Sequence, residues 1–110
     1  ADLSCAKLIC AKLRSANLQT DELIGADLSS AKLYGANLSS TDLRYAFLRY
    51  TITDLIGANL KSTNLKGADL VHADLIGADL TNANLKGVKG LDTAKLCKTI
   101  MPWGEDNSSC

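Results

Sequence analysis

Leucine recurs at every fifth position through most of this chain, and this spacing restricts the possible fold more than any other feature. Five-residue units with a central Leu run from residue 1 to 50 and, after a shift of two residues at 51–52, from 53 to 87. Ten units followed by seven cover 85 of the 110 residues. Ala stands two residues before the Leu in thirteen units, and Asp or Asn directly precedes the Leu in twelve. The chain is therefore built from internal repeats, which favours a solenoid or another stacked architecture.

A period of five fits neither an amphipathic helix nor a regular strand. At about 100° per residue, successive leucines would drift by about 140° around a helix and leave no single apolar face. Strand alternation holds from the Ala to the Leu of each unit and then breaks. Apolar residues whose spacing alternates between two and three predict short extended segments that are joined by turns. Each segment places one small and one large side chain inside a solenoid whose coils stack on one another.

The repeat units resemble those of the pentapeptide repeat family. The stretches ADLSS, ANLSS, ADLIGADL and ANLKG match its A-(D/N)-L-x-x signature, and the resemblance covers about three quarters of the chain. It implies an all-β solenoid, a right-handed quadrilateral β-helix with four units per coil and one unit per face. Seventeen units then give about four coils, and we expect the β-helix over 1–87 and a C-terminal cap over 88–110.

Stacking four units per coil predicts four inward-facing leucine columns, with equivalent residues 20 apart, or 22 apart across the shift. The Asp and Asn side chains before the leucines are expected to form turn hydrogen bonds. Six of the eight Gly lie two residues after Leu, all in odd-numbered units, which predicts two alternating turn types. The middle coils should bury these core residues: Leu28, Leu33, Leu38, Leu43, Leu48, Leu55, Leu60 and Leu65.

The C-terminal segment departs from the repeat. Residues 91–98 read as a short helix with Asp92 as its N-cap. The apolar residues that follow, Ile100, Met101 and Trp103, are expected to plug the last coil.

Four cysteines lie near the two ends of the chain. Cys97 and Cys110 bracket the cap, and similar cysteine-bracketed tails occur in pentapeptide repeat proteins of cyanobacteria and the thylakoid lumen. The resemblance therefore implies a disulfide and an oxidising compartment, the thylakoid lumen or the periplasm. The alternative is two reduced thiols in a cytoplasmic protein. We expect Cys5 and Cys10 to be free thiols.

Composition argues against several classes of function. Twelve basic and twelve acidic residues give no net charge, unlike the basic footprint of a nucleic-acid binder or the acidic rod of a DNA mimic. The apolar runs are too short to insert into a membrane. The pattern offers no converging titratable groups for catalysis and no cluster of metal ligands, so we expect neither an enzyme nor a cofactor. His72 is interpreted as a surface residue.

One region interrupts the repeat and is the candidate site. Three of the four Phe and Tyr residues gather with an Arg at the two-residue shift, and this composition is typical of interface hot spots. The predicted partner-binding residues are Tyr45, Phe47, Arg49, Tyr50 and Ile52. The alternative is that the inserted residues fold back over the rings and only complete the local packing. A weaker feature is the basic group of Lys12, Arg14 and Lys32 on another face.

These observations favour a non-enzymatic structural or protein-interaction module with an unidentified protein partner. The resemblance allows two alternatives, a cytoplasmic regulator that binds a transcription factor and, with less support, a DNA-mimicking topoisomerase inhibitor. Because the chain begins directly in the repeat, we also expect an uncapped first coil that permits end-to-end self-association.

Overall fold

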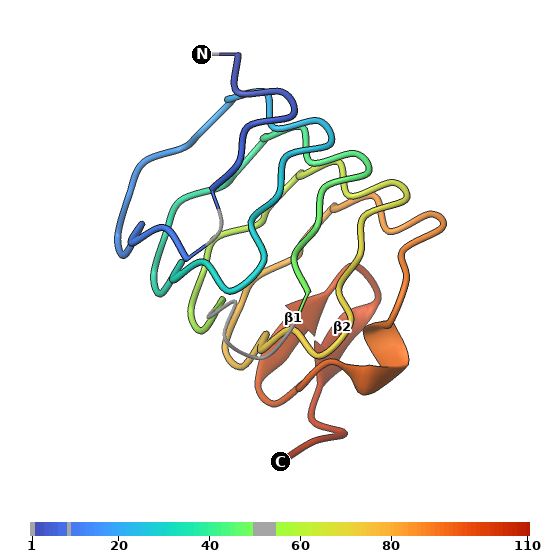
Figure 1. Ribbon diagram of the computed structural model, residues 1–110. Coiled ribbons are helices and arrows are strands. Elements are labelled where there is room, and N and C mark those ends of the chain that lie inside the picture. Colours follow the sequence, from blue (N-terminus) through green and yellow to red (C-terminus); the bar gives the residue numbers. More distant parts are fainter. Residues whose placement is uncertain (1, 9, 50–54) are drawn as a thin grey trace.

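The chain winds into a four-sided solenoid whose coils stack along one axis (Figure 1). The computed structural model describes residues 2–8, 10–49 and 55–110, and its principal extents are 33 × 24 × 24 Å. Parallel bridges join each coil to the next, as between Asn17 and Asn37, which are 20 residues apart. Across the shift the spacing becomes 22, as between Asn37 and Asn59. The column register therefore follows the five-residue units as the sequence predicts, and the two extra residues leave it intact.

Each described corner of the solenoid is a hydrogen-bonded turn. The N–H of the first residue of a unit donates to the carbonyl of the preceding Leu, as Ala26 does to Leu23 at 3.0 Å. The residue two after the Leu has a positive φ, between 55° and 70°, at all sixteen described corners. A single positive φ at the third residue of the turn defines type II. The prediction of two alternating turn types is wrong, because Ser, Thr, Asn and Cys corners adopt the same conformation as glycine corners.

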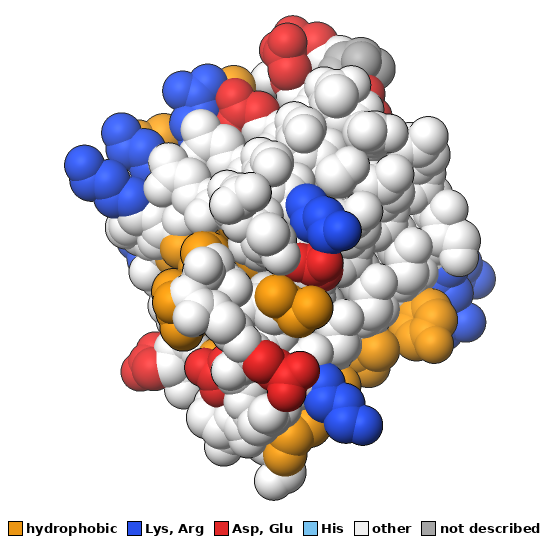
Figure 2. Space-filling model, turned by 180° about the vertical axis from the view of Figure 1, so that it is seen from behind, with side chains coloured by type: hydrophobic (Ala, Val, Ile, Leu, Met, Phe, Trp, Pro, Cys, Tyr) orange, Lys and Arg blue, Asp and Glu red, His pale blue; other side chains and the backbone are white. Residues whose placement is uncertain are grey.

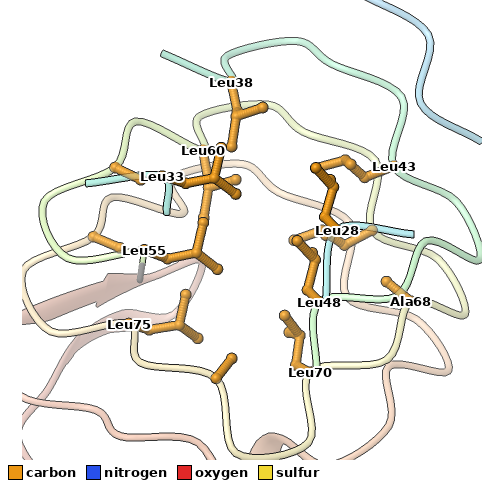
Figure 3. Packing of buried hydrophobic residues seen from close by; sticks show 14 of the residues in the cluster. Leu28, Leu33, Leu38, Leu43, Leu48, Leu55, Leu60, Ala68, Leu70 and Leu75 are labelled. Atoms are coloured by element: carbon orange, nitrogen blue, oxygen red, sulfur yellow. The ribbon is translucent and has the colours of Figure 1, made fainter. Parts of the chain in front are cut away.

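Four columns of leucine fill the interior (Figure 3). Leu33, Leu55 and Leu75 lie one above the other in one column, and the leucines of the facing columns point toward them. The eight leucines expected in the core are each at most 1% exposed. Fully burying one such side chain contributes about 1.5–3 kcal/mol, so the columns supply most of the stabilisation.

Alanine and threonine share the second inward position because the space beside four leucines per coil is small. Thr41 and Thr63 replace Ala there and are 1% exposed. Their hydroxyls donate to the carbonyls of Leu18 and Leu38 at 2.8 and 2.9 Å. A buried hydroxyl without a partner would be destabilising, and these bonds remove that cost.

The Asp and Asn residues before the leucines hold the corners. Their Oδ1 atom accepts a hydrogen bond from the backbone N–H two residues later, as Asp27 accepts from Ser29 and Asn59 from Lys61. This is the Asx-turn geometry that short polar side chains favour. The predicted turn role of these side chains is confirmed, and it explains their outward position.

The solenoid continues beyond residue 87, where the sequence predicts its end. Lys95 and Ile100 form parallel bridges with Asp74 and Asp79, so residues 94–101 extend two of the columns. Leu96 and Met101 take the leucine positions and are 7% and 1% exposed. Thr99 is 0% exposed and donates its hydroxyl to the Leu75 carbonyl at 2.7 Å. The boundary between 1–87 and 88–110 is therefore not a boundary of the β-helix.

The cap beyond this coil contains less helix than the sequence predicts. A 3₁₀ helix, η1, spans only Leu91–Thr93, and its N-cap is Gly90 rather than Asp92. Strands β1 (Thr99–Met101) and β2 (Gly104–Asp106) then form an antiparallel hairpin at the C-terminal end of the stack (Figure 1).

Of the three residues expected to plug the last coil, only Met101 is buried. Ile100 is 41% exposed and Trp103 is 66% exposed. Strand alternation explains Ile100, because neighbouring residues of β1 point to opposite sides. Trp103 lies in the turn between β1 and β2, outside the strands that cover the coil.

A disulfide joins Cys97 to Cys110, with their Cα atoms 4.9 Å apart. It closes the hairpin segment into a loop with a sequence separation of 13. Near it, the Ser109 N–H donates to the Leu96 carbonyl at 2.8 Å. Cys5 and Cys10 are exposed free thiols at two corners.

We expect reduction of the disulfide to destabilise the cap by about 3 kcal/mol, the chain-entropy estimate for a loop of this length. Peptide mapping without reductant should recover Cys97 linked to Cys110, while Cys5 and Cys10 react with a thiol reagent in the native protein. If all four thiols of air-oxidised native protein were labelled, the disulfide and the compartment inferred from it would both be rejected.

The leucine side chains of the first coil are more exposed to solvent than those of the second coil. Leu3, Leu8 and Leu13 are partly exposed, whereas the corresponding leucines of the second coil are fully buried. Among the described residues, no helix combines the length and the apolar character that crossing a membrane requires.

Candidate functional site

The predicted site lies on the third coil, immediately before the two-residue shift. Tyr45, Phe47 and Arg49 are described there, whereas Tyr50 and Ile52 lie outside the described residues. Tyr45 is at a corner and Phe47 opens the next face, so both rings reach the surface, with 55% and 43% exposure. We refer to Tyr45, Phe47 and Arg49 as the aromatic patch.

Tyr45 occupies an unfavourable backbone conformation. Its φ is 59°, in the left-handed region, where a bulky side chain costs about 1 kcal/mol. The ring lies over the Gly67 corner of the next coil, where a Cβ added to the glycine would come within 2.6 Å of the ring atoms Cδ1 and Cε1. The glycine one coil below therefore provides the space in which the ring lies.

Phe47 replaces the Asp or Asn that holds most corners. Its backbone pairs with Asp27 on one side and Asp69 on the other, so the ring is outward between two carboxylate positions. Arg49 is anchored by the same column, because its Nε lies 3.2 Å from an Asp69 carboxylate oxygen. The patch thus combines an exposed ring with a guanidinium fixed by an ion pair. Preorganised groups of this kind are the anchors of protein interfaces.

A second ion pair borders the patch on the preceding face. The Arg44 side chain donates to both carboxylate oxygens of Asp42, at distances from 2.7 to 3.1 Å. The Arg44 hydrogen bonds lower the pKa of Asp42, and the partial burial of the carboxylate opposes this effect. Arg44 is therefore neutralised within its own unit.

Within the described ranges of the chain, no group of three or more His, Cys, Asp or Glu side chains could hold a metal ion. His72 is exposed, and its backbone N–H donates to the Thr93 hydroxyl at 3.0 Å.

Two shallow grooves on the described part of the surface are lined by basic side chains. Lys12, Arg14 and Lys32 line one of about 280 Å³, so the structure brings together the basic group seen in the sequence. Sequence analysis missed the other, of about 320 Å³, which Tyr45, two glycines and three lysines line. The sequence could have indicated this groove, because Lys66 and Lys86 are 20 residues apart and therefore lie in the same column of the solenoid.

Figure 2 shows one face of the molecule, on which basic and acidic side chains lie in small groups, in several places next to one another. This face carries no acidic surface of the kind that imitates DNA.

Comparison with known proteins agrees with the solenoid. The sequence model of the family described as pentapeptide repeats matches eight copies over residues 22–52 and 53–89, which together exceed half of the chain. The chain belongs to the pentapeptide repeat family. The members of this family fold as right-handed β-helices, and the two matched stretches meet at the shift in the repeat. No curated protein matches the chain.

Several solved structures resemble this pentapeptide repeat protein. HetL from the cyanobacterium Nostoc sp. strain PCC 7120, described as involved in the regulation of heterocyst differentiation, is 32% identical with a TM-score of 0.50. The match covers 94% of this chain and 62% of HetL. Another pentapeptide repeat protein of Nostoc PCC 7120 is 39% identical over 74% of this chain and 62% of its own, with a TM-score of 0.39. One from the Arabidopsis thaliana thylakoid lumen is 31% identical over 89% and 63%, with a TM-score of 0.35. The chain thus spans less than two thirds of each of these proteins.

Proposed function

We propose that this protein is a non-enzymatic interaction module whose rigid β-helix presents the aromatic patch to a protein partner. The observation that carries the proposal is the exposure of Tyr45 and Phe47 on a scaffold whose inward positions are nearly all Leu and Ala and whose residue before the Leu is Asp or Asn in twelve units. A partner can recognise one place on a repetitive surface only where that surface is irregular.

Packing energetics support this interpretation. Phe47 gives up the Asx hydrogen bond that an Asp or Asn would make, and Tyr45 adopts a positive φ that glycine would adopt without strain. Both residues therefore reduce local stability and expose apolar area. A binding role accounts for both features, because aromatic anchors contribute far more to association than the residues around them.

A regulatory role is the second candidate, and the likeness to HetL favours it. HetL is described as involved in the regulation of heterocyst differentiation, and the match to HetL covers 94% of this chain. We propose on this basis that the partner belongs to a regulatory pathway, with a transcription factor as one class to test. A topoisomerase partner has less support, because the charge is balanced rather than acidic.

We further propose an oxidising compartment, the thylakoid lumen or the periplasm. The support is the disulfide between Cys97 and Cys110, since structural disulfides persist where glutathione does not reduce them. The cytoplasm is the alternative that the peptide mapping described above addresses.

The variant Phe47→Asp should abolish capture of the partner from native extract while leaving the protein folded. It replaces an exposed ring with Asp, which seven of the seventeen units already carry at this position, so the solenoid should accept it. Loss of one aromatic anchor at an interface typically costs about 2 kcal/mol or more, a reduction in affinity of at least about thirtyfold. Capture is measured by mass spectrometry of the proteins retained on the immobilised chain.

Tyr34→Asp is the matched control, since Tyr34 is 52% exposed on another face. This variant should retain the partner. Equal retention by the wild type and Phe47→Asp would mean that the patch is local packing and that the partner binds a regular face.

A further inference from the structure

The groove that sequence analysis missed shares Tyr45 with the aromatic patch and extends from it toward the C-terminal end of the solenoid. Its volume is about 320 Å³, at the lower end of the range of small-ligand sites. The lining consists of one aromatic ring, three lysines and two corner glycines: Tyr45, Lys66, Gly67, Lys86, Gly87 and Lys89.

The register of the coils gathers these lysines. Asn64 bridges to Asn84, so the lysines two residues after each, Lys66 and Lys86, are equivalent positions on successive coils. Lys89 comes from the next face, where it bridges to Asp69. All three side chains are exposed at the groove.

The positive charge of the groove is not neutralised within the described part of the chain. One coil earlier, the equivalent Arg44 is paired with the Asp42 carboxylate at 2.7 Å. At Lys66 and Lys86 that carboxylate position is occupied by Asn64 and Asn84, whose amides are uncharged.

Asp69, the carboxylate that bridges to Lys89 in the adjoining column, already has a cationic partner. Asp69 lies 3.2 Å from Arg49 and also accepts a hydrogen bond from the Val71 N–H. Within residues 2–8, 10–49 and 55–110, no ion pair involves Lys66, Lys86 or Lys89. Three ammonium groups therefore share a concavity without a counter-charge.

The glycine corners add a backbone donor and open space. The Gly67 N–H donates to the Lys86 carbonyl at 2.9 Å, as the corner N–H groups of this column do from coil to coil. Gly87, the last corner of the column, is an exposed residue, and its N–H donates to no acceptor among the described residues. The ring of Tyr45 lies against Gly67 and walls the other side of the groove.

We propose that this groove binds a phosphate group, either free or as a phosphate monoester. Ammonium groups bind phosphate as point charges, and a free backbone N–H supplies a directed hydrogen bond to one of its oxygens. A monoester with a planar substituent would gain an additional contact with the Tyr45 ring. Phe47 lies outside the groove lining, so this site and the partner-binding patch can be tested separately.

Amide chemical shifts in ¹H–¹⁵N correlation spectra test the proposal. Inorganic phosphate and adenosine monophosphate are titrated in separate series at constant ionic strength. The amides of Gly67, Gly87 and Lys89 should shift and saturate in both series. Tighter binding of the nucleotide would assign a contribution to the Tyr45 ring, and Tyr45→Ser should then remove only that difference. Equal binding would assign the site to the phosphate group alone.

The double variant Lys66→Gln, Lys86→Gln should weaken binding by at least about tenfold, because each removes a charge-assisted contact. The matched control is Lys12→Gln, Lys32→Gln, which removes the same charge from the other basic groove and should change nothing. Shifts that grow linearly without saturation, or that are equal around Lys12, Arg14 and Lys32, would show general counterion binding and overturn the proposal.

Discussion

Truncating one leucine in the middle of a column should destabilise the protein strongly. We expect Leu55→Ala to lower the free energy of unfolding by about 2–5 kcal/mol, because it removes buried methyl groups and leaves a cavity between coils. Leu55 is 0% exposed and lies between Leu33 and Leu75 (Figure 3). For a domain of this size, the thermal midpoint should fall by roughly 10 °C or more. Denaturant and thermal unfolding followed by circular dichroism measure both quantities.

Gln19→Ala is the control for this prediction. Gln19 is exposed, and it donates a hydrogen bond to Asn17 Oδ1 through its backbone N–H rather than its side chain. Its free energy of unfolding should change by less than about 0.5 kcal/mol. Similar losses from Leu55→Ala and Gln19→Ala would mean that the inward and outward positions are assigned wrongly.

The second large effect is expected at Gly90, the N-cap of η1. Its φ is 76°, and a Cβ at this position would lie 2.6 Å from the Cα and 2.7 Å from the N of Val71. Because these are backbone atoms of the coil beneath, the cap must move to accommodate Gly90→Ala. Overpacking of this kind costs about 1–3 kcal/mol in addition to the strain of a positive φ.

Gly57→Ala separates the two contributions. Gly57 has a φ of 66°, and a Cβ there would meet nothing within 4 Å. This variant should therefore show only the conformational cost, about 1–2 kcal/mol. Equal destabilisation of the two variants in chemical denaturation would show that close packing of the cap on Val71 contributes nothing.

The regular part of the fold could be predicted because the residue pattern within each five-residue unit determines it. A five-residue spacing of Leu with Ala two positions earlier admits one arrangement of inward side chains, and the spacings of 20 and 22 then set the register. The corner conformations could not be inferred from glycine alone. Ser40 and His72 have φ values of 57° and 58°, close to those of the glycine corners. The coil-to-coil pairing imposes this conformation on every residue type.

The C-terminal region shows why the rest was missed. Ala94 and Leu96, followed by Thr99 and Met101, keep the small-then-large spacing of a repeat unit, and Leu96 and Met101 are five residues apart. Met in place of Leu and Thr in place of Ala obscure this pattern, so the sequence predicts a helix over 91–98 and an apolar plug after it. The basic groove was missed for a different reason, since it exists only when residues of two coils and two faces are brought together.

Photo-crosslinking from the patch tests the central claim, that this irregular place on the solenoid is where a partner binds. The photoreactive residue p-benzoylphenylalanine is incorporated in place of Phe47 or, separately, of Tyr34, and each protein is irradiated in native extract. The account predicts a discrete crosslinked product from position 47 and none from position 34. Crosslinking from position 34 alone, or equally from both positions, would contradict it.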